Sequence, residues 1–358
     1  MISLSNNGKP CHVQGFLLLC GTVLLLIGCS SREKASNSGL ITLSGKAQGT
    51  TFTIKYRDSL QRDLSGPIDS LLNVVDRSMS LWDSTSTVTQ FNAAPDTFQS
   101  TDQHFKTVFA LSQNLWRSTN NAFDPTVLPV VKAWGVGKSG RGDLDTASVA
   151  GLRQLVGMDK LRMEQGPLTH GSVLSMISYF RALPGIQFDP NGIAQGYSVD
   201  LITFLLQQAG ITNYMVEVGG ETRCSGQNDK GTPWLMQIDK PVDGPQHEQQ
   251  TVVPLADKSL ATSGNYRKFI EVGGKRYGHT IDPRTCRPAM NALLSASVIA
   301  DDCATADALG TALMVMGPEE GREWLAQHPE VEAYLVIDDG AGGYTVWSTP
   351  GWPKSSAQ

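Results

Sequence analysis

The sequence predicts an α+β domain rather than a doubly wound α/β fold. Apolar residues recur at helical spacing in some segments and alternate with polar residues in others, and the two patterns do not follow one another in regular strand–helix order. No internal repeat and no linker-like segment interrupts residues 40–349. We therefore expect one domain, and a chain of this length buries a sizeable core.

The first half is expected to begin with a pair of strands. Residues 40–57 alternate apolar and polar positions on both sides of Gly45 to Gly49, which indicates strand, turn, strand. Residues 67–82 and 101–120 carry apolar side chains at helical spacing, so both are predicted to be amphipathic helices. Asp102 or Thr101 is placed to cap the second helix.

The second half is expected to contain a helix over 192–209 that follows a glycine-rich turn. Asp302 is placed to cap a helix over 304–316, which Gly317-Pro318 should close. The other expected elements are a short helix at 146–156, strands at 214–218, 234–239 and 295–300, and a closing hairpin of 332–338 with 344–348.

The amino-terminal segment has the pattern of an export signal. Residues 16–28 are apolar but too few to span a bilayer, which takes about 20 residues. They end in Leu26-Ile27-Gly28-Cys29, which resembles a bacterial lipobox. We expect residues 1–28 to be removed, Cys29 to carry lipid, 29–39 to form a flexible tether, and 350–358 to form a tail. The alternative is an ordinary signal peptide that happens to end in Cys.

These features predict a lipid-anchored lipoprotein of the bacterial cell envelope that faces the periplasm. Removal of residues 1–28 takes away Lys9 and no acid, so 29 − 1 = 28 basic residues face 34 acidic ones, a net charge of −6. No basic run occurs anywhere in the chain. Nucleic acid is therefore not an expected partner.

Three cysteines remain in the expected mature chain besides Cys29, namely Cys224, Cys286 and Cys303. Their spacing shows neither a CxxC pair nor a zinc pattern, which favours buried or paired structural residues. A disulfide between Cys286 and Cys303 is one hypothesis for them.

Three separated segments carry small, polar and glycine residues where a core would need bulk: 189–197, 279–283 and 306–311. Together they supply carboxylates, a hydroxyl and exposed carbonyls, which is the ligand set of a hard cation such as Mg²⁺. Asp307 and Thr311 are four residues apart and share one face of the expected helix. The alternative is an Asp stabilised by the helix N-terminus and a Thr that bonds back to the preceding turn.

Two further positions have more than one interpretation. Gly192 and Gly196 permit a close approach of backbone to a ligand at the start of a helix, where phosphate binds readily, or they form an ordinary loop. His279 is a candidate base, or it simply satisfies local hydrogen bonds.

Eight motifs occur along the chain in a characteristic order: 49–52, 76–82 with 91–92, 122–129 with 134–137, 189–200, 218–221, 261–266, 279–283 and 306–311. In this order they resemble the ApbE family of FAD:protein FMN transferases, over residues 43–340. The resemblance implies an α+β core with a T-fold-like arrangement. It also implies Mg²⁺-dependent transfer of FMN from FAD to a Thr or Ser hydroxyl of a partner protein, with release of AMP.

The resemblance also assigns roles to residues of this chain. Asp307 and Thr311 are expected to bind the metal with the backbone carbonyl of Gly192, and His279 and Asp307 to be catalytic, with Asp282 as a second candidate for the base. The expected FAD contacts are Gln48, Trp82, Ala122, Phe123, Asp124, Asp189, Gln195 and Ile281. The implied partners are redox subunits of membrane complexes of the sodium-pumping quinone reductase and Rnf types.

Two positions depart from the family pattern. Gln195 stands where many relatives have Lys or Glu, and Cys286 stands where many have Gly. If the turn at Cys286 requires a positive φ, the side chain imposes strain. Two alternatives to the transferase use the same residues: a Mg²⁺-dependent FAD pyrophosphatase, and a lipoprotein that binds FAD without turnover.

Overall fold

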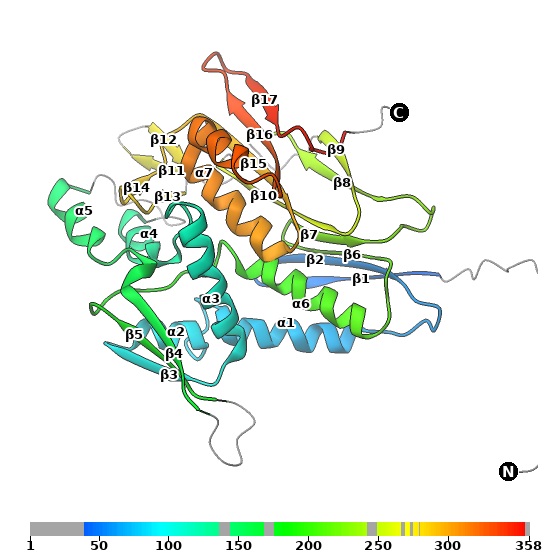
Figure 1. Cartoon of the computed structure of the whole chain (residues 1–358), viewed down its shortest axis with the longest axis horizontal. Coiled ribbons are helices and arrows are strands. Elements are labelled where there is room, and N and C mark those ends of the chain that lie inside the picture. The colour runs from blue at the N-terminus through cyan, green and yellow to red at the C-terminus, as the bar shows by residue number, and fades with distance from the viewer. Residues whose placement is uncertain are drawn as a thin grey trace, which may run out of the picture. The chain divides into compact units, whose positions relative to one another are not determined.

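The computed structural model describes residues 39–135, 144–167, 175–241, 249–265, 269–272, 275–278 and 280–354. The segment Ser38–Gln358 forms one compact unit, and its mixture of strands and helices confirms the α+β class (Figure 1). Among the described residues, no helix has both the length and the apolar character needed to cross a membrane.

The centre of this unit is a sheet of eight antiparallel strands in the order β1-β2-β6-β7-β10-β15-β16-β17. Its strands are β1 (Leu40–Ala47), β2 (Thr50–Arg57), β6 (Tyr214–Val218), β7 (Glu221–Ser225), β10 (Lys258–Gly264), β15 (Leu293–Ala300), β16 (Glu332–Asp338) and β17 (Tyr344–Ser348). Buried positions alternate with partly buried ones along β2 from Phe52 onward, which is the period of a half-buried strand. The sheet provides the rigid layer on which the helices of the candidate site rest.

Smaller sheets surround the main one. They are β3 (Thr97–Ser100), β5 (Ile177–Arg181) and β4 (Leu161–Gln165) in one sheet, β8 (Trp234–Asp239) with β9 (Gln249–Leu255), β11 (Phe269–Val272) with β12 (Lys275–Gly278), and β13 (Ile281–Asp282) with β14 (Arg287–Pro288).

The helices are α1 (Ser65–Met79), α2 (Thr87–Ala93), α3 (Gln103–Ser118), α4 (Leu128–Trp134), α5 (Thr146–Arg153), α6 (Ala194–Gln208) and α7 (Cys303–Ala326). Short 3₁₀ turns occupy Pro125–Val127 and Met158–Lys160. Helices α6 and α7 pack side by side on the sheet, α6 against β6 and β7 and α7 against β10 and β15 (Figure 1). Most of α7 is buried, because the helix lies between the sheet and the aromatic cluster around Phe91, Phe105 and Phe109.

Several sequence predictions are confirmed at residue level. The strands expected at 214–218, 234–239, 332–338 and 344–348 have the predicted bounds. The helix predicted over 101–120 is α3, and Asp102 caps it, because Asp102 Oδ1 accepts hydrogen bonds from the amides of His104 at 2.8 Å and Phe105 at 3.1 Å.

One helix end is confirmed and one prediction is wrong. The helix predicted over 304–316 does end at Gly317, whose φ of 76° and ψ of −177° are not helical. A second helical segment, which was not predicted, begins at once at Pro318 and continues to Ala326, because proline is well suited to the first turn of a helix. The Cys286–Cys303 disulfide does not exist: both thiols are free and buried. The two residues belong to different hydrophobic clusters, so a bond between them has no basis in the fold.

Candidate functional site

The starts of α6 and α7 touch each other at one glycine. A Cβ added to Gly196 would lie 2.4 Å from the carbonyl oxygen of Cys303 and 2.8 Å from Cα of Ala304, so only glycine allows this approach. The amide of Gly196 in turn donates a hydrogen bond to Asp307 Oδ2 at 3.2 Å. The two helices therefore meet at the carboxylate that the sequence marked as a metal ligand.

The three predicted metal-binding residues lie close together. A Cβ added to Gly192 would lie 3.1 Å from Thr311 Oγ1 and 3.4 Å from Cε2 of Phe123. Thr311 follows Asp307 by one helical turn on α7. A backbone carbonyl from the turn into α6 thus lies near a carboxylate and a hydroxyl on one face of α7. These are hard oxygen donors, and their chemistry fits Mg²⁺.

Burial and nearby acids control the charge of the site. The pKa of Asp307 is raised to about 7, mainly by burial and to a lesser degree by the carboxylate of Asp200, while the amide of Gly196 lowers it. Burial also raises the pKa of Glu221 well above its usual value, and the negative charge of Asp307 raises it further. Neither pKa shift has a cationic side chain among its causes. A bound cation would supply the missing positive charge.

Glu221 is a feature that sequence reasoning did not assign to the site. It begins β7 after the turn at Gly219 and Gly220, and only 8% of it is exposed. Among the described residues, its Oε2 has no hydrogen-bond partner, which is costly for a buried carboxyl oxygen. The sequence motif at 218–221 indicated only a turn, because nothing local shows that its acid faces another acid.

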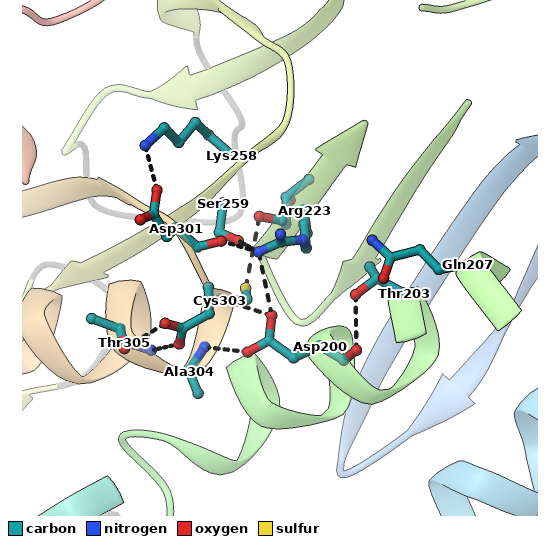
Figure 2. Close-up of polar contacts among 12 residues, drawn as sticks. Asp200, Thr203, Gln207, Arg223, Lys258, Ser259, Asp301, Cys303, Ala304 and Thr305 are labelled. Carbon is teal, nitrogen blue, oxygen red and sulfur yellow. Dashed lines mark hydrogen bonds and ion pairs between the residues drawn. The ribbon is translucent and has the colours of Figure 1, made fainter. Parts of the chain in front are cut away.

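A second connection between α6 and α7 lies at Asp200, one helical turn after Gly196 (Figure 2). Asp200 of α6 accepts hydrogen bonds from the amides of Cys303 and Ala304, each at 2.9 Å. Arg223 of β7 lies 3.8 Å from the same carboxylate. Burial raises the pKa of Asp200 to about 6, whereas the two amides and Arg223 lower it.

The β1–β2 turn contacts α6 through Gln48. Gln48 has φ 53° in this turn, its Nε2 donates to Ser198 Oγ of α6 at 2.6 Å, and its Oε1 is buried without a partner within the described structure. An open cleft of about 460 Å³ is lined by residues 46–51. Gln195 approaches from α6, since a Cβ on Gly219 would lie 2.7 Å from its Nε2. Two predicted FAD contacts therefore lie at the start of α6, Gln195 as a residue of the helix and Gln48 through its bond to Ser198.

The predicted contacts around residues 122–124 and 189 form a tightly bonded group. Ala122 and Phe123 are buried. Asp124 Oδ1 accepts from the amide of Thr126 at 2.8 Å and from its hydroxyl at 2.5 Å, and burial raises the pKa of Asp124 to about 6. The amide of Asp189 donates to Pro125 O at 2.7 Å, so residue 189 is fixed beside this loop. Phe123 connects the group to Gly192.

Other predicted residues lie apart or in different roles. Trp82 is 82% exposed, so its indole is open to solvent. Ile281 is buried in the cluster that contains Trp134 and Cys286. Asp282 is engaged by Arg284, whose Nε lies 3.1 Å from Oδ1, which argues against Asp282 as a free base.

Two predicted site residues, His279 and Cys29, lie outside the described residues. The turn after Asp282 does place Cys286 at φ 56°, the left-handed conformation that favours glycine. A side chain there costs about 1–2 kcal/mol.

Comparison with known proteins gives concordant matches. Residues 48–335 match the sequence model of the ApbE family. The FAD:protein FMN transferase of Vibrio cholerae is 36% identical over 93% of this chain and 97% of the relative, and that of Haemophilus influenzae is 33% identical over 89% and 93%. Two solved structures are also similar. The flavin transferase ApbE from Vibrio cholerae has a TM-score of 0.74 at 33% identity, covering 87% of this chain and 97% of the other. The flavinyl transferase ApbE of Pseudomonas stutzeri, in its apo form, has a TM-score of 0.75 at 31% identity, covering 87% and 95%.

Proposed function

This chain belongs to the ApbE family, and from that premise we propose that it is an FAD:protein FMN transferase that moves FMN from FAD to a Thr or Ser hydroxyl of a partner protein. One observation carries the proposal beyond family membership. Gly192 and Gly196, at the turn into α6, lie against Thr311 and Asp307 of α7, although Gly196 and Asp307 are 111 residues apart in the sequence. That convergence assembles hard oxygen ligands beside a helix N-terminus, a combination suited to a pyrophosphate substrate with Mg²⁺.

The chain's own residues would bind and orient the substrate. Asp307 and Thr311 present their oxygens from α7, and the amide of Gly196 holds the carboxylate in place. The N-terminus of α6 favours a phosphate group electrostatically. Mg²⁺, when bound, neutralises charge that builds on the phosphoanhydride oxygens. Phe123, in contact range of Gly192, gives the site an apolar wall for a ring of FAD.

The transfer itself exchanges one phosphorus–oxygen bond for another. The acceptor hydroxyl oxygen bonds to the phosphorus of the FMN moiety, the anhydride bond to the AMP moiety breaks, and AMP leaves with the bonding electron pair. The hydroxyl proton passes to a base, because an alcohol is a weak nucleophile while protonated. His279 is the proposed base, since Asp282 is held by Arg284.

The proposed setting is the bacterial cell envelope. Cys29 would carry the lipid, and the acceptor would be an extracytoplasmic redox subunit of a membrane complex, of the quinone reductase or Rnf type. What supports this setting is the lipobox-like segment that ends at Cys29. Globomycin, which blocks processing of lipidated precursors, should leave the precursor uncleaved if Cys29 is the lipidation site.

The test of the activity is incubation of residues 38–358, which form one compact unit, with FAD, MgCl₂ and an acceptor domain. Intact mass follows the acceptor, and chromatography follows AMP and free FMN. A mass gain equal to covalent FMN, absent with Asp307→Asn, supports the transferase. AMP and free FMN with every acceptor tried would make the protein a pyrophosphatase, and FAD bound but unchanged would make it a binding protein.

A further inference from the structure

Three contacts between α6 and α7, including the turn before α6, follow a regular spacing. Gly192 lies against Thr311, Gly196 against Asp307, and Asp200 against Cys303. Each step is four residues forward on the α6 side and four residues back on α7. The two segments therefore run antiparallel, with one contact per helical turn of about 5.4 Å.

These three contacts, called rungs below, fix the position of Gly192 relative to Asp307 and Thr311 on α7. At Gly192 and Gly196 the two helices are held by close backbone approach and by one hydrogen bond from an amide. Such contacts prevent the helices from moving closer together, but they restrain sliding of one helix along the other only weakly. A slip of one residue along a helix axis is about 1.5 Å, enough to separate a carbonyl on one helix from ligands on the other. The rung at Asp200 is different, because both carboxylate oxygens bind amides of α7.

We propose that Asp200 is a positioning residue of the metal site, which keeps Asp307 and Thr311 in register with Gly192 by clamping the start of α7 to α6. The inference rests on the proposed function, because it assumes that these oxygens bind Mg²⁺. The inference predicts that Asp200 affects metal affinity, although Asp200 lies two contacts along the series from Gly192.

The surroundings of Asp200 hold its carboxylate in one orientation (Figure 2). Its side chain is 23% exposed, and Arg223 lies 3.8 Å away. Arg223 is itself anchored, since it donates to Ser259 Oγ at 3.2 Å and to the carbonyl oxygen of Asp301. Residues that orient metal ligands from one layer further out typically change metal affinity about 10–100-fold when removed.

A helix cap alone does not explain Asp200, because α7 already has one. Asp302 Oδ1 accepts from the amide of Thr305 at 2.7 Å, and the Thr305 hydroxyl donates to Asp302 Oδ2 at 2.9 Å. Both acids stabilise the same helix terminus, but only Asp200 comes from α6. Asp302→Ala is therefore a matched control: it removes a cap of the same helix, worth about 1 kcal/mol, and leaves the connection between the helices intact.

The experiment titrates MgCl₂ into flavin-free wild type, Asp200→Ala, Asp200→Asn and Asp302→Ala by isothermal calorimetry, with urea unfolding of each in parallel. We expect Asp200→Ala to weaken Mg²⁺ binding about 10–100-fold, Asp200→Asn to fall between it and wild type, and Asp302→Ala to retain near-wild-type affinity despite lower stability.

A loss in Asp200→Ala no larger than in Asp302→Ala overturns the inference and leaves the proposed function intact. If both Asp200 variants fail to fold while Asp302→Ala folds, the role of Asp200 is structural and the inference is again overturned. No Mg²⁺ binding by wild type would instead remove the metal from the proposed function, and the inference with it.

Discussion

Gly196→Ala tests the closest contact in the candidate site. The new Cβ would lie 2.4 Å from the carbonyl oxygen of Cys303, where an ordinary contact begins at 3.4 Å, so the shortfall is 3.4 − 2.4 = 1.0 Å. The obstructing atoms are backbone atoms of Cys303 and Ala304, which cannot rotate away. One helix must therefore move by about 1 Å, at an overpacking cost of roughly 1–3 kcal/mol.

The substitution should harm function more than stability. A misplacement of about 1 Å can cost 10²-fold in rate, and here it separates the amide of residue 196 from Asp307. We expect unfolding in urea to show a loss of about 1–3 kcal/mol, and FAD turnover to fall by about two orders of magnitude. Gly151→Ala is the control, because Gly151 lies on α5 with nothing within 4 Å of an added Cβ. It should be neutral or stabilising by up to about 1 kcal/mol.

The reasoning is refuted if Gly196→Ala is as stable as Gly151→Ala and as active as wild type. That result would mean that α6 and α7 separate without cost, and that the amide–carboxylate contact does not position Asp307. Stability retained with activity lost would keep the positional argument but show that the core accommodates the methyl group.

Three further substitutions or conditions probe the same region. Asp307→Asn should retain or gain stability in metal-free protein, because it removes a buried charge, yet lower FMN transfer by at least about 10²-fold, as denaturation and acceptor mass will show. Gly192→Ala places a methyl group 3.1 Å from Thr311 Oγ1, so it should weaken Mg²⁺ binding in calorimetry with only a small change in melting temperature. Burial raises the pKa of Asp124 and Asp200 to about 6 and that of Asp307 to about 7 in the folded protein, whereas the unfolded value is near 4. Between about pH 4 and 7 the folded state therefore binds more protons than the unfolded state. Urea midpoints of metal-free protein should therefore decrease from about pH 4 to 7 through these groups. Asp307→Asn should make that decrease shallower, and an unchanged slope in this variant would argue against a buried carboxyl at 307.

Local patterns explain why much of the fold could be predicted. The hairpin at 40–57, α3 and the closing hairpin each have a periodicity or a cap within a few residues, so their physics is contained in the segment itself. Strands β7 and β13 were missed because they are short and depend on pairing, β7 with β6 and β10 and β13 with β14, which local propensity does not report. The helix end at Gly317 was predicted, but the second helical segment from Pro318 was missed because the signal for an end and the signal for a new start are adjacent.

The type of ligand at the candidate site could be predicted from the sequence, whereas the contacts that bring the ligands together could not. Residue types at 192, 307 and 311 were sufficient to suggest hard oxygen ligands, and helical spacing placed Asp307 and Thr311 on one face. Only the tertiary structure shows that Gly196 allows two helix starts to touch, that Glu221 is buried beside Asp307, and that Asp200 binds the amides of another helix. The physical reason is range: periodicity, capping and ligand type act within a few residues, but close approach, burial and charge coupling depend on segments about a hundred residues apart.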